Sequence, residues 1–299
     1  MPMLWIFPLK IPIWTKIHAS EFVRQLQAEK DHRSFCSADL FFGIKGGNMA
    51  AEIENKIHHY LDHFICGDTI QVMSSMPSNS IDLVVTSPPY NLKNSTGNGM
   101  KAGTKTGRWA NNPLQNGYTH HGDDMPYDKY ISWQRECLTE MMRLLKETGA
   151  IFYNHKTRVQ AGLLQDRHEI LDGFPVRQCI IWRRKGGFNF NPGYFVPTYE
   201  VIYLIAKPKF KLVKGANGHG DIWEFTQEMK NSHPAPFPVA LPTRCIESTD
   251  AEIILDPFSG SGTTALAARR LGRKYIGIDI SPEYCKQAAD RLASEFSFA

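Results

Sequence analysis

The chain has 299 residues, of which 42% are hydrophobic and 21% are charged, a composition typical of globular proteins. This unbiased composition excludes collagen-like, disordered and coiled-coil proteins, and no apolar run reaches the length of about 18 residues that a transmembrane helix needs. The net charge of +4 is compatible with a polyanionic partner but does not require one.

The first 48 residues differ in character from the rest. They begin with an apolar stretch that prolines and lysines interrupt, so it does not fit a signal peptide. Met49 opens a segment with a helical pattern of apolar side chains, which are Ile53, Ile57, Leu61 and Phe64. We therefore predict that 1–48 is an extension outside the functional protein and that the catalytic domain spans 49–299. An N-terminal arm that packs on the domain is the alternative.

From residue 64 the sequence alternates strands and helices. Seven short stretches rich in Ile and Val are predicted strands: Phe64–Cys66, Ile81–Thr86, Ala150–Asn154, Gln178–Trp182, Tyr199–Ala206, Ile253–Leu255 and Tyr275–Ile280. Most are apolar on both faces, which predicts an α/β fold with a largely parallel sheet covered by helices. The clearest helix is predicted at Asp128–Lys146, and Gly149 follows its end.

Two irregular stretches, 91–126 and 183–198, interrupt this alternation. The first holds six Gly and six Asn among 36 residues, and a loop of that length in a compact domain is usually functional or disordered. The second lies in the segment 177–214, which carries eight basic residues against the single acid Glu200. The net charge of this segment is +7, so the rest of the chain has a net charge of −3. Basic residues among aromatic ones suit phosphates and unstacked bases, although the same pattern also fits an exposed basic face.

A glycine-rich turn, Asp256-Pro-Phe-Ser-Gly-Ser-Gly-Thr-Thr264, separates a predicted strand from a helix. Glycines let the backbone approach a ligand closely, and the helix N-terminus offers N–H groups. Asp279 ends the next strand, 19 residues after Gly260, at the usual offset for a carboxylate that binds ribose hydroxyls. The turn also fits a dinucleotide fingerprint. Only 20 residues follow Asp279, however, so S-adenosylmethionine fits better than NAD, and an oxidoreductase is the weaker alternative.

A second turn, Thr86-Ser87-Pro88-Pro89-Tyr90, ends the strand that begins at Ile81. Two prolines cannot continue a central strand, so they form a rigid turn. It offers the Ser87 side chain and the Pro88 carbonyl as acceptors, and the Tyr90 ring as a stacking face. These groups suit a flat substrate with an exocyclic amine, whose methylation requires an aligned lone pair and the exclusion of water. A plain structural turn is the alternative.

Together the two turns resemble the signatures of exocyclic-amino DNA methyltransferases, [DNS]-P-P-[YFW] and D-P-F-x-G-x-G-T. The catalytic turn precedes the cofactor turn, as in the circularly permuted β group of N4-cytosine and N6-adenine DNA methylases of bacteria and phages. Protein-glutamine and ribosomal-RNA amino methyltransferases share an N-P-P-Y turn but usually carry the cofactor turn first. The resemblance covers about residues 60–299. It implies a Rossmann-like, largely parallel seven-stranded sheet with helices on both faces.

The resemblance also implies roles for individual residues. S-adenosylmethionine would be bound by Asp68, His233, Phe237, Asp256, Phe258, Gly260, Gly262, Thr263 and Asp279. A base flipped out of the duplex would be held by the catalytic residues Ser87, Pro88, Pro89 and Tyr90. The DNA contacts are predicted from the basic pattern described above and not from the resemblance; they are Lys93, Arg108, Arg183, Arg184 and Lys185. These basic residues fall in or beside two predicted recognition loops, at about 91–126 and 183–232.

The target base and the chemistry have alternatives. Ser87 together with Phe237 resembles the cytosine-N4 subgroup, so we favour N4 of cytosine over N6 of adenine. Cytosine-C5 chemistry needs a Pro-Cys nucleophile, and none of the six cysteines follows a proline. A nucleic-acid-binding protein that keeps the fold without catalysis is the alternative from another class, although every residue that the two motifs need is present.

The expected partners and location follow from the same reading. Double-stranded DNA is the expected partner, and a cognate restriction endonuclease and a homodimer are compatible with the resemblance, whereas a membrane is not expected. The cysteines are scattered without a C-x-x-C pair, so we expect neither zinc nor disulfides. The cysteine pattern fits a reducing cytoplasm, and the resemblance implies that of a bacterial or phage-infected cell.

Overall fold

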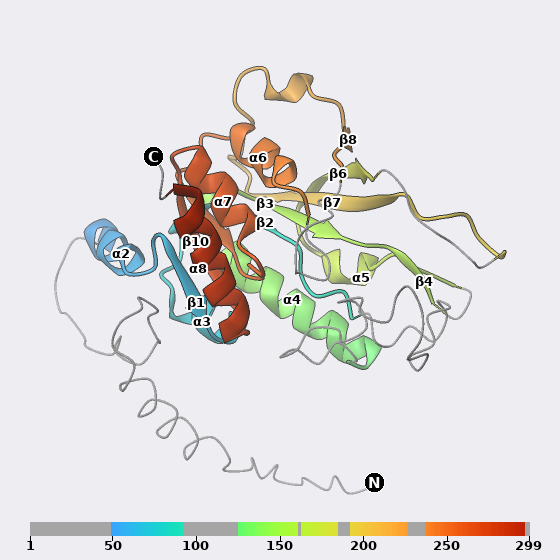
Figure 1. The fold of residues 1–299 in the computed structure, drawn as a ribbon, viewed down its shortest axis with the longest axis horizontal. Coiled ribbons are helices and arrows are strands. Elements are labelled where there is room, and N and C mark those ends of the chain that lie inside the picture. The colour runs from blue at the N-terminus through green and yellow to red at the C-terminus, as the bar shows by residue number, and fades with distance from the viewer. Residues whose placement is uncertain (1–48, 92–124, 161–162, 185–191, 227–236, 297–299) are drawn as a thin grey trace, which may run out of the picture. The chain divides into compact units, whose positions relative to one another are not determined.

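The computed structural model describes residues 49–91, 125–160, 163–184, 192–226 and 237–296 (Figure 1). All of them belong to one compact unit, Phe35–Ala299. Residues 1–48 lie outside the described residues, so the predicted extension stays a prediction. None of the helices in the described ranges is long and apolar enough to cross a membrane, and the five cysteines in those ranges are free thiols.

An eight-stranded sheet forms the centre of this unit, in the order β1-β10-β9-β2-β3-β7-β6-β8. Its strands are β1 (His63–Cys66), β2 (Ile81–Thr86), β3 (Leu145–His155), β6 (Val176–Arg183), β7 (Tyr199–Ala206), β8 (Ile222–Glu224), β9 (Ile253–Asp256) and β10 (Lys274–Asp279). Only β7 runs against its neighbours β3 and β6; the other pairs are parallel. The predicted α/β fold with a largely parallel sheet is confirmed, and all seven predicted strands lie in this sheet.

The implied number of seven strands is wrong, because β8 adds an eighth strand beside β6 at the edge. Of its three residues only Trp223 is buried, so the segment is too short to show a strand pattern in the sequence. A separate hairpin of β4 (Arg158–Gln160) and β5 (Leu163–Gln165) was not predicted either. Both are short additions to the expected sheet.

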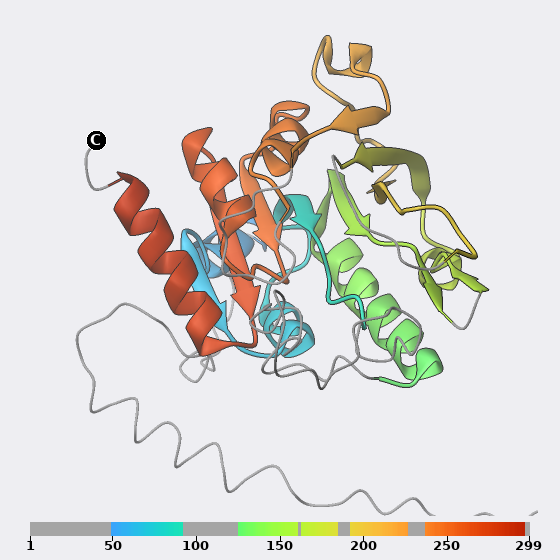
Figure 2. The ribbon, with the colours of Figure 1, turned by 45° about the vertical axis from the view of Figure 1, so that its right-hand side comes forward.

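Helices cover both faces of the sheet (Figures 1 and 2). One face carries α2 (Met49–His58), α3 (Thr69–Ser75), α4 (Tyr127–Leu144) and α5 (His168–Leu171). The other carries α6 (Ala240–Glu247), α7 (Thr263–Arg270) and α8 (Pro282–Phe296). A short 3-10 helix, η2 (Ala216–Gly218), lies in the connection before β8. Helices on both faces explain why most strands are apolar on both sides.

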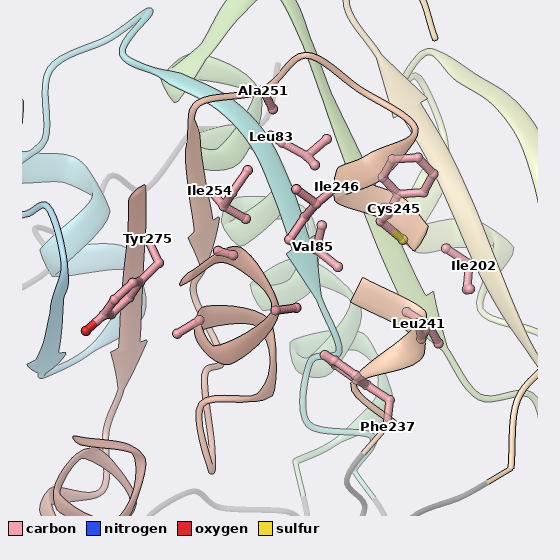
Figure 3. Packing of buried hydrophobic residues seen from close by; sticks show 14 of the residues in the cluster. Leu83, Val85, Ile202, Phe237, Leu241, Cys245, Ile246, Ala251, Ile254 and Tyr275 are labelled. Atoms are coloured by element: carbon pink, nitrogen blue, oxygen red, sulfur yellow. The ribbon is translucent and has the colours of Figure 1, made fainter. Parts of the chain in front are cut away.

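The two faces have separate apolar cores. Figure 3 shows part of the core under α6 and α7, where Leu241 and Cys245 of α6 face strand residues such as Val85 and Ile202. The side chains of α7 in this core are small apart from Leu266, because the helix is rich in alanine. Small side chains let a helix lie close to the sheet, and α7 begins directly at the glycine-rich turn.

Two helix predictions had different outcomes. The helix predicted at Asp128–Lys146 is confirmed as α4, which ends where β3 begins, at Leu145. The helical spacing of apolar residues continues to Phe64 in the sequence, but it does not correspond to one helix, because α2 ends at His58. Asp62 takes a left-handed conformation with φ 61°, which ends the connection and starts β1, and Phe64 packs on Tyr275 of β10 with ring centroids 5.3 Å apart.

Candidate active site

The two predicted turns meet at one edge of the sheet because the strands before them are neighbours. β2 pairs in parallel with β9, with Leu83 opposite Ile254, so both strands end at the edge where α/β folds bind ligands. Thr86 ends β2 and Asp256 ends β9. The Thr86 Oγ1 donates a hydrogen bond of 2.7 Å to Asp256 Oδ1, which joins two turns 170 positions apart in the sequence.

Asp256 is a buried carboxyl group that shapes the cofactor turn from inside. Its exposed fraction is 2%, and burial raises its pKa to about 6 despite the opposing hydrogen bond from Thr86. The backbone N–H of Phe258 donates 3.1 Å to the same Oδ1. Asp256 therefore fixes both the start of the glycine-rich turn and its distance from the catalytic turn.

The glycine-rich turn depends on a left-handed backbone. Gly260 has φ 49° and Gly262 has φ 75°, values that non-glycine residues rarely adopt. A Cβ atom on Gly262 would also lie only 2.9 Å from Phe64 Cζ and from Ala288 Cβ. Gly262 is the N-cap of α7 and Thr263 its first residue, so the turn delivers the chain into the helix at the sheet edge.

Asp279 is oriented by the backbone on both sides. Its Oδ2 accepts a hydrogen bond of 2.8 Å from Gly260 N, and its Oδ1 accepts one of 2.9 Å from Ser281 N. These two hydrogen bonds fix the orientation of the carboxylate. The carboxylate is held directly beside the glycine-rich turn, where the sequence predicted it.

The turn after β1 joins the same edge. Asp68 caps α3 by accepting a hydrogen bond of 3.0 Å from Gln71 N, and Gly67 N donates 2.9 Å to the backbone oxygen of Asp279. Thr69 Oγ1 donates 2.5 Å to the Pro257 carbonyl. Asp68, Asp279 and the glycine-rich turn are therefore brought together, as the resemblance implied for a cofactor site.

The catalytic turn is fastened to α4. The Pro89 carbonyl accepts hydrogen bonds from the Tyr130 hydroxyl at 2.8 Å and from Gln134 Nε2 at 3.3 Å. Asn91, with φ 56°, ends the turn and donates to the Met125 carbonyl at 2.8 Å. No residue in the described ranges donates to the Pro88 carbonyl, which leaves this acceptor at the turn.

Sequence reasoning missed a polar cluster behind the turn. Ser87 Oγ lies 2.5 Å from the Tyr90 hydroxyl oxygen, and Tyr90 in turn donates to Glu200 Oε2 at 3.2 Å. Asn154 Nδ2 donates to the Tyr90 oxygen and to Glu200 Oε2, each at 2.9 Å. Arg184 Nη1 lies 3.3 Å from Glu200 Oε1. One signal pointed here: Glu200 is the only acid in a basic segment and stands at the start of an apolar strand, where a charge is rare.

The remaining predicted residues differ in their surroundings. Tyr90 is a buried residue with an exposed fraction of 4%, and its ring centroid lies 5.2 Å from that of His155. Phe237 is buried beside Leu241 (Figure 3). Arg183 is exposed and pairs with Glu224 of β8 at 2.6 Å. The Arg184 side chain is only 13% exposed and faces the polar cluster. The predicted residues that lie outside the described ranges are Lys93, Arg108, Lys185 and His233.

Comparisons with known proteins identify the family of this chain. The family model of N6/N4 methyltransferases, described as DNA methylase, matches residues 81–290. The type II methyltransferase M.HpaI of Haemophilus parainfluenzae is 30% identical over an alignment of 258 residues, gaps included, which covers 78% of this chain and 74% of that protein. The type II methyltransferase M.BglII of Bacillus subtilis is 29% identical over an alignment of 278 residues, gaps included, which covers 79% of this chain and 70% of that protein.

Solved structures share the fold. The Thermus thermophilus protein TTHA0409, solved in complex with S-adenosyl-L-methionine, is 25% identical with a TM-score of 0.57, over 78% of this chain and 93% of that one. The cytosine-N4-specific PvuII DNA methyltransferase has a TM-score of 0.61 at 20% identity, over 77% and 85% of the two chains, which shows a common fold alone. Since the family model matches well over half of the chain, this protein belongs to the DNA methylase family of N6 and N4 methyltransferases.

Proposed function

We propose that this protein is an S-adenosylmethionine-dependent, site-specific DNA methyltransferase that methylates the exocyclic amine of a flipped base, with N4 of cytosine as the target. The observation that carries the proposal is the hydrogen bond between Thr86 and Asp256. It fixes a turn suited to an amine directly beside a turn suited to a nucleoside cofactor. Membership of the DNA methylase family supports DNA as the substrate.

The residues around the glycine-rich turn suit the cofactor. S-adenosylmethionine supplies an electrophilic methyl group when it is bound. Asp279 is oriented to accept hydrogen bonds from ribose hydroxyls, and Asp68 stands at the neighbouring turn for the adenine amine. The left-handed glycines let the backbone come close to a ligand. The complex of the Thermus thermophilus relative with S-adenosyl-L-methionine supports the same cofactor here.

The catalytic turn would hold the amine by its two protons. Ser87 Oγ and the Pro88 carbonyl would each accept one N–H, which directs the nitrogen lone pair toward the methyl group. Tyr90 would pack against the base. A base inside the duplex cannot reach this turn, so the target must be flipped out, and the enzyme would select its sequence through contacts in the DNA grooves.

The preference for cytosine rests on Ser87 and Phe237, which together resemble the cytosine-N4 subgroup. Mass spectrometry of nucleosides from DNA treated with the protein and labelled cofactor tests both the activity and the base. We expect N4-methylcytosine. N6-methyladenine in its absence would reverse the choice of base, and bound cofactor without any methylated DNA would contradict the enzymatic proposal.

Sequence specificity and partners complete the proposal. We expect the loops at about 91–126 and 183–232 to read the DNA sequence, and exchanging them with those of a relative should change the methylated site in methylation-sensitive sequencing. An unchanged site after the exchange would contradict this role. A cognate restriction endonuclease and a homodimer stay predictions.

A further inference from the structure

The polar cluster behind the catalytic turn has a fixed direction of hydrogen bonding. Glu200 is paired with the Arg184 guanidinium, and a carboxylate can only accept. The Tyr90 oxygen lies 3.2 Å from Glu200 Oε2, and without a proton between them these two oxygens would repel each other. The single proton of the Tyr90 hydroxyl is therefore directed to Glu200. Asn154 Nδ2 has three acceptors in reach, and its two protons go to the closer ones, Glu200 Oε2 and the Tyr90 oxygen at 2.9 Å each, while Ser87 Oγ is 3.4 Å away. The Nδ2 atom of Asn154 must face the carboxylate, since its amide oxygen there would be repelled.

This direction determines what Ser87 can do. Ser87 Oγ lies 2.5 Å from the Tyr90 oxygen, and one of the two hydroxyls must donate to the other. Because Tyr90 already donates to Glu200, the donor is Ser87. The Ser87 proton is then used inside the protein, and its oxygen presents only lone pairs to the substrate side of the turn.

We propose that Glu200 is a positioning residue that makes Ser87 a pure acceptor for the exocyclic amine, acting through Tyr90. This rests on the proposed function. The amine has two N–H donors, so it needs acceptors at both positions. If Tyr90 donated to Ser87 instead, the Ser87 proton would point at the amine and oppose its N–H groups. The Glu200 carboxylate, which is connected to the amine through the Tyr90 and Ser87 hydroxyls, prevents that reversal.

The surroundings of Glu200 fit this role better than a purely structural one. Its exposed fraction is 6%, and a buried ion pair often contributes no more to stability than apolar residues of similar volume. Arg184 and Asn154 supply the partners that such a buried charge requires. The negative charge of Glu200 therefore lies where it can orient the hydroxyl groups of Tyr90 and Ser87.

Two variants test the proposal in steady-state methylation assays. In Glu200→Gln the amide can donate to Tyr90, which frees the Tyr90 proton for Ser87. In Tyr90→Phe the aromatic ring and the ion pair between Glu200 and Arg184 stay, but the hydrogen bonds that connect Glu200 to Ser87 through the Tyr90 hydroxyl are lost. For each variant we expect kcat to fall about 10- to 100-fold, the range for the loss of one oriented hydrogen bond. KM for cofactor and the thermal midpoint should change little in Tyr90→Phe.

The double variant gives a readout that a structural role would not move. Both substitutions break the same series of hydrogen bonds from Glu200 to Ser87. The fall in kcat of the double variant should therefore be no larger than the larger fall of the two single variants, whereas independent effects would multiply. Glu247→Gln, an exposed glutamate of α6, is the matched control and should keep the kcat of the unmodified protein.

The outcomes separate this inference from the proposed function. If the unmodified protein binds cofactor but methylates no DNA, the proposed function fails. If it is active and either single variant keeps its kcat, or the two losses multiply, the role of Glu200 is overturned. Should Glu200→Gln not fold, Tyr90→Phe decides alone: full kcat in that variant overturns the inference, and a loss of kcat at unchanged KM supports it.

Discussion

The buried carboxyl group of Asp256 makes the stability of this protein depend on pH in a predictable direction. Burial raises its pKa from the ordinary 3.8 to about 6. The folded protein therefore holds the proton more tightly than the unfolded chain, and this group's contribution to stability falls as the pH rises from about 4 to about 6. Asp256→Asn removes the titration while its Oδ1 can still accept from Thr86 and from Phe258 N.

The size of the effect follows from the two pKa values. At about 1.4 kcal/mol per pH unit, the interval between 3.8 and about 6 corresponds to about 3 kcal/mol. The group is 2% exposed, so solvent screening reduces this little. Relative to the unmodified protein, the Asp256→Asn variant should therefore gain about 2 kcal/mol between pH 4 and pH 7, because at pH 4 part of the titration of the unfolded chain has already occurred.

Urea unfolding of both proteins at a series of pH values measures this difference. Other titrating groups are common to both proteins and cancel, and so does any constant cost of the substitution. The extrapolated free energies of unfolding should diverge in favour of the variant as the pH rises. A difference that stays constant from pH 4 to pH 7 would refute the reasoning that burial dominates at Asp256.

Three further predictions concern the turns and the N-terminus. Gly262→Ala should lower the free energy of unfolding by roughly 2 kcal/mol through its left-handed φ and the contact with Phe64. Gly220→Ala, which has open space around it, should change it by less than about 0.5 kcal/mol, and equal effects would contradict the packing argument. Ser87→Ala should bind cofactor in calorimetry yet lose about 10- to 100-fold in methyl transfer; undiminished transfer would argue against Ser87 as an acceptor. Deleting residues 1–48 should leave activity and solubility intact, and an insoluble or inactive product would show that the segment belongs to the domain.

The sheet and the two turns were predictable because each is encoded locally. Seven strands show as short apolar runs, and the turn that begins at Ser87 and the one that begins at Asp256 show as compact motifs at strand ends. The short edge strand β8 was missed, since its three residues contain only one buried side chain. Its place depends on pairing with β6, a contact that is distant in the sequence.

Local patterns single out Glu200 but do not predict its partners in the polar cluster. Tyr90 and Glu200 are 110 positions apart and meet only because strands β2, β3 and β7 are neighbours in the sheet. The partners of the basic residues could not be predicted for the same reason. Arg177 is exposed and donates to the carbonyls of Phe210 and Pro208, whereas Arg184 is largely buried and faces Glu200.

The contact of the last helix with the first strand bears on the order of the motifs along the chain. α8 packs on β1 and β10, and its Phe296 ring lies 4.3 Å from the Arg269 guanidinium at the amino end of the strands. At that same end, Asp62 directly before β1 pairs with Lys274 at 2.6 Å. A linker from the end of α8 to α2, which leads into β1, would therefore close the described part of the chain into a ring at this end of the sheet. Which turn comes first is a matter of where such a ring is opened, and enzymes with the opposite motif order can present the same catalytic edge.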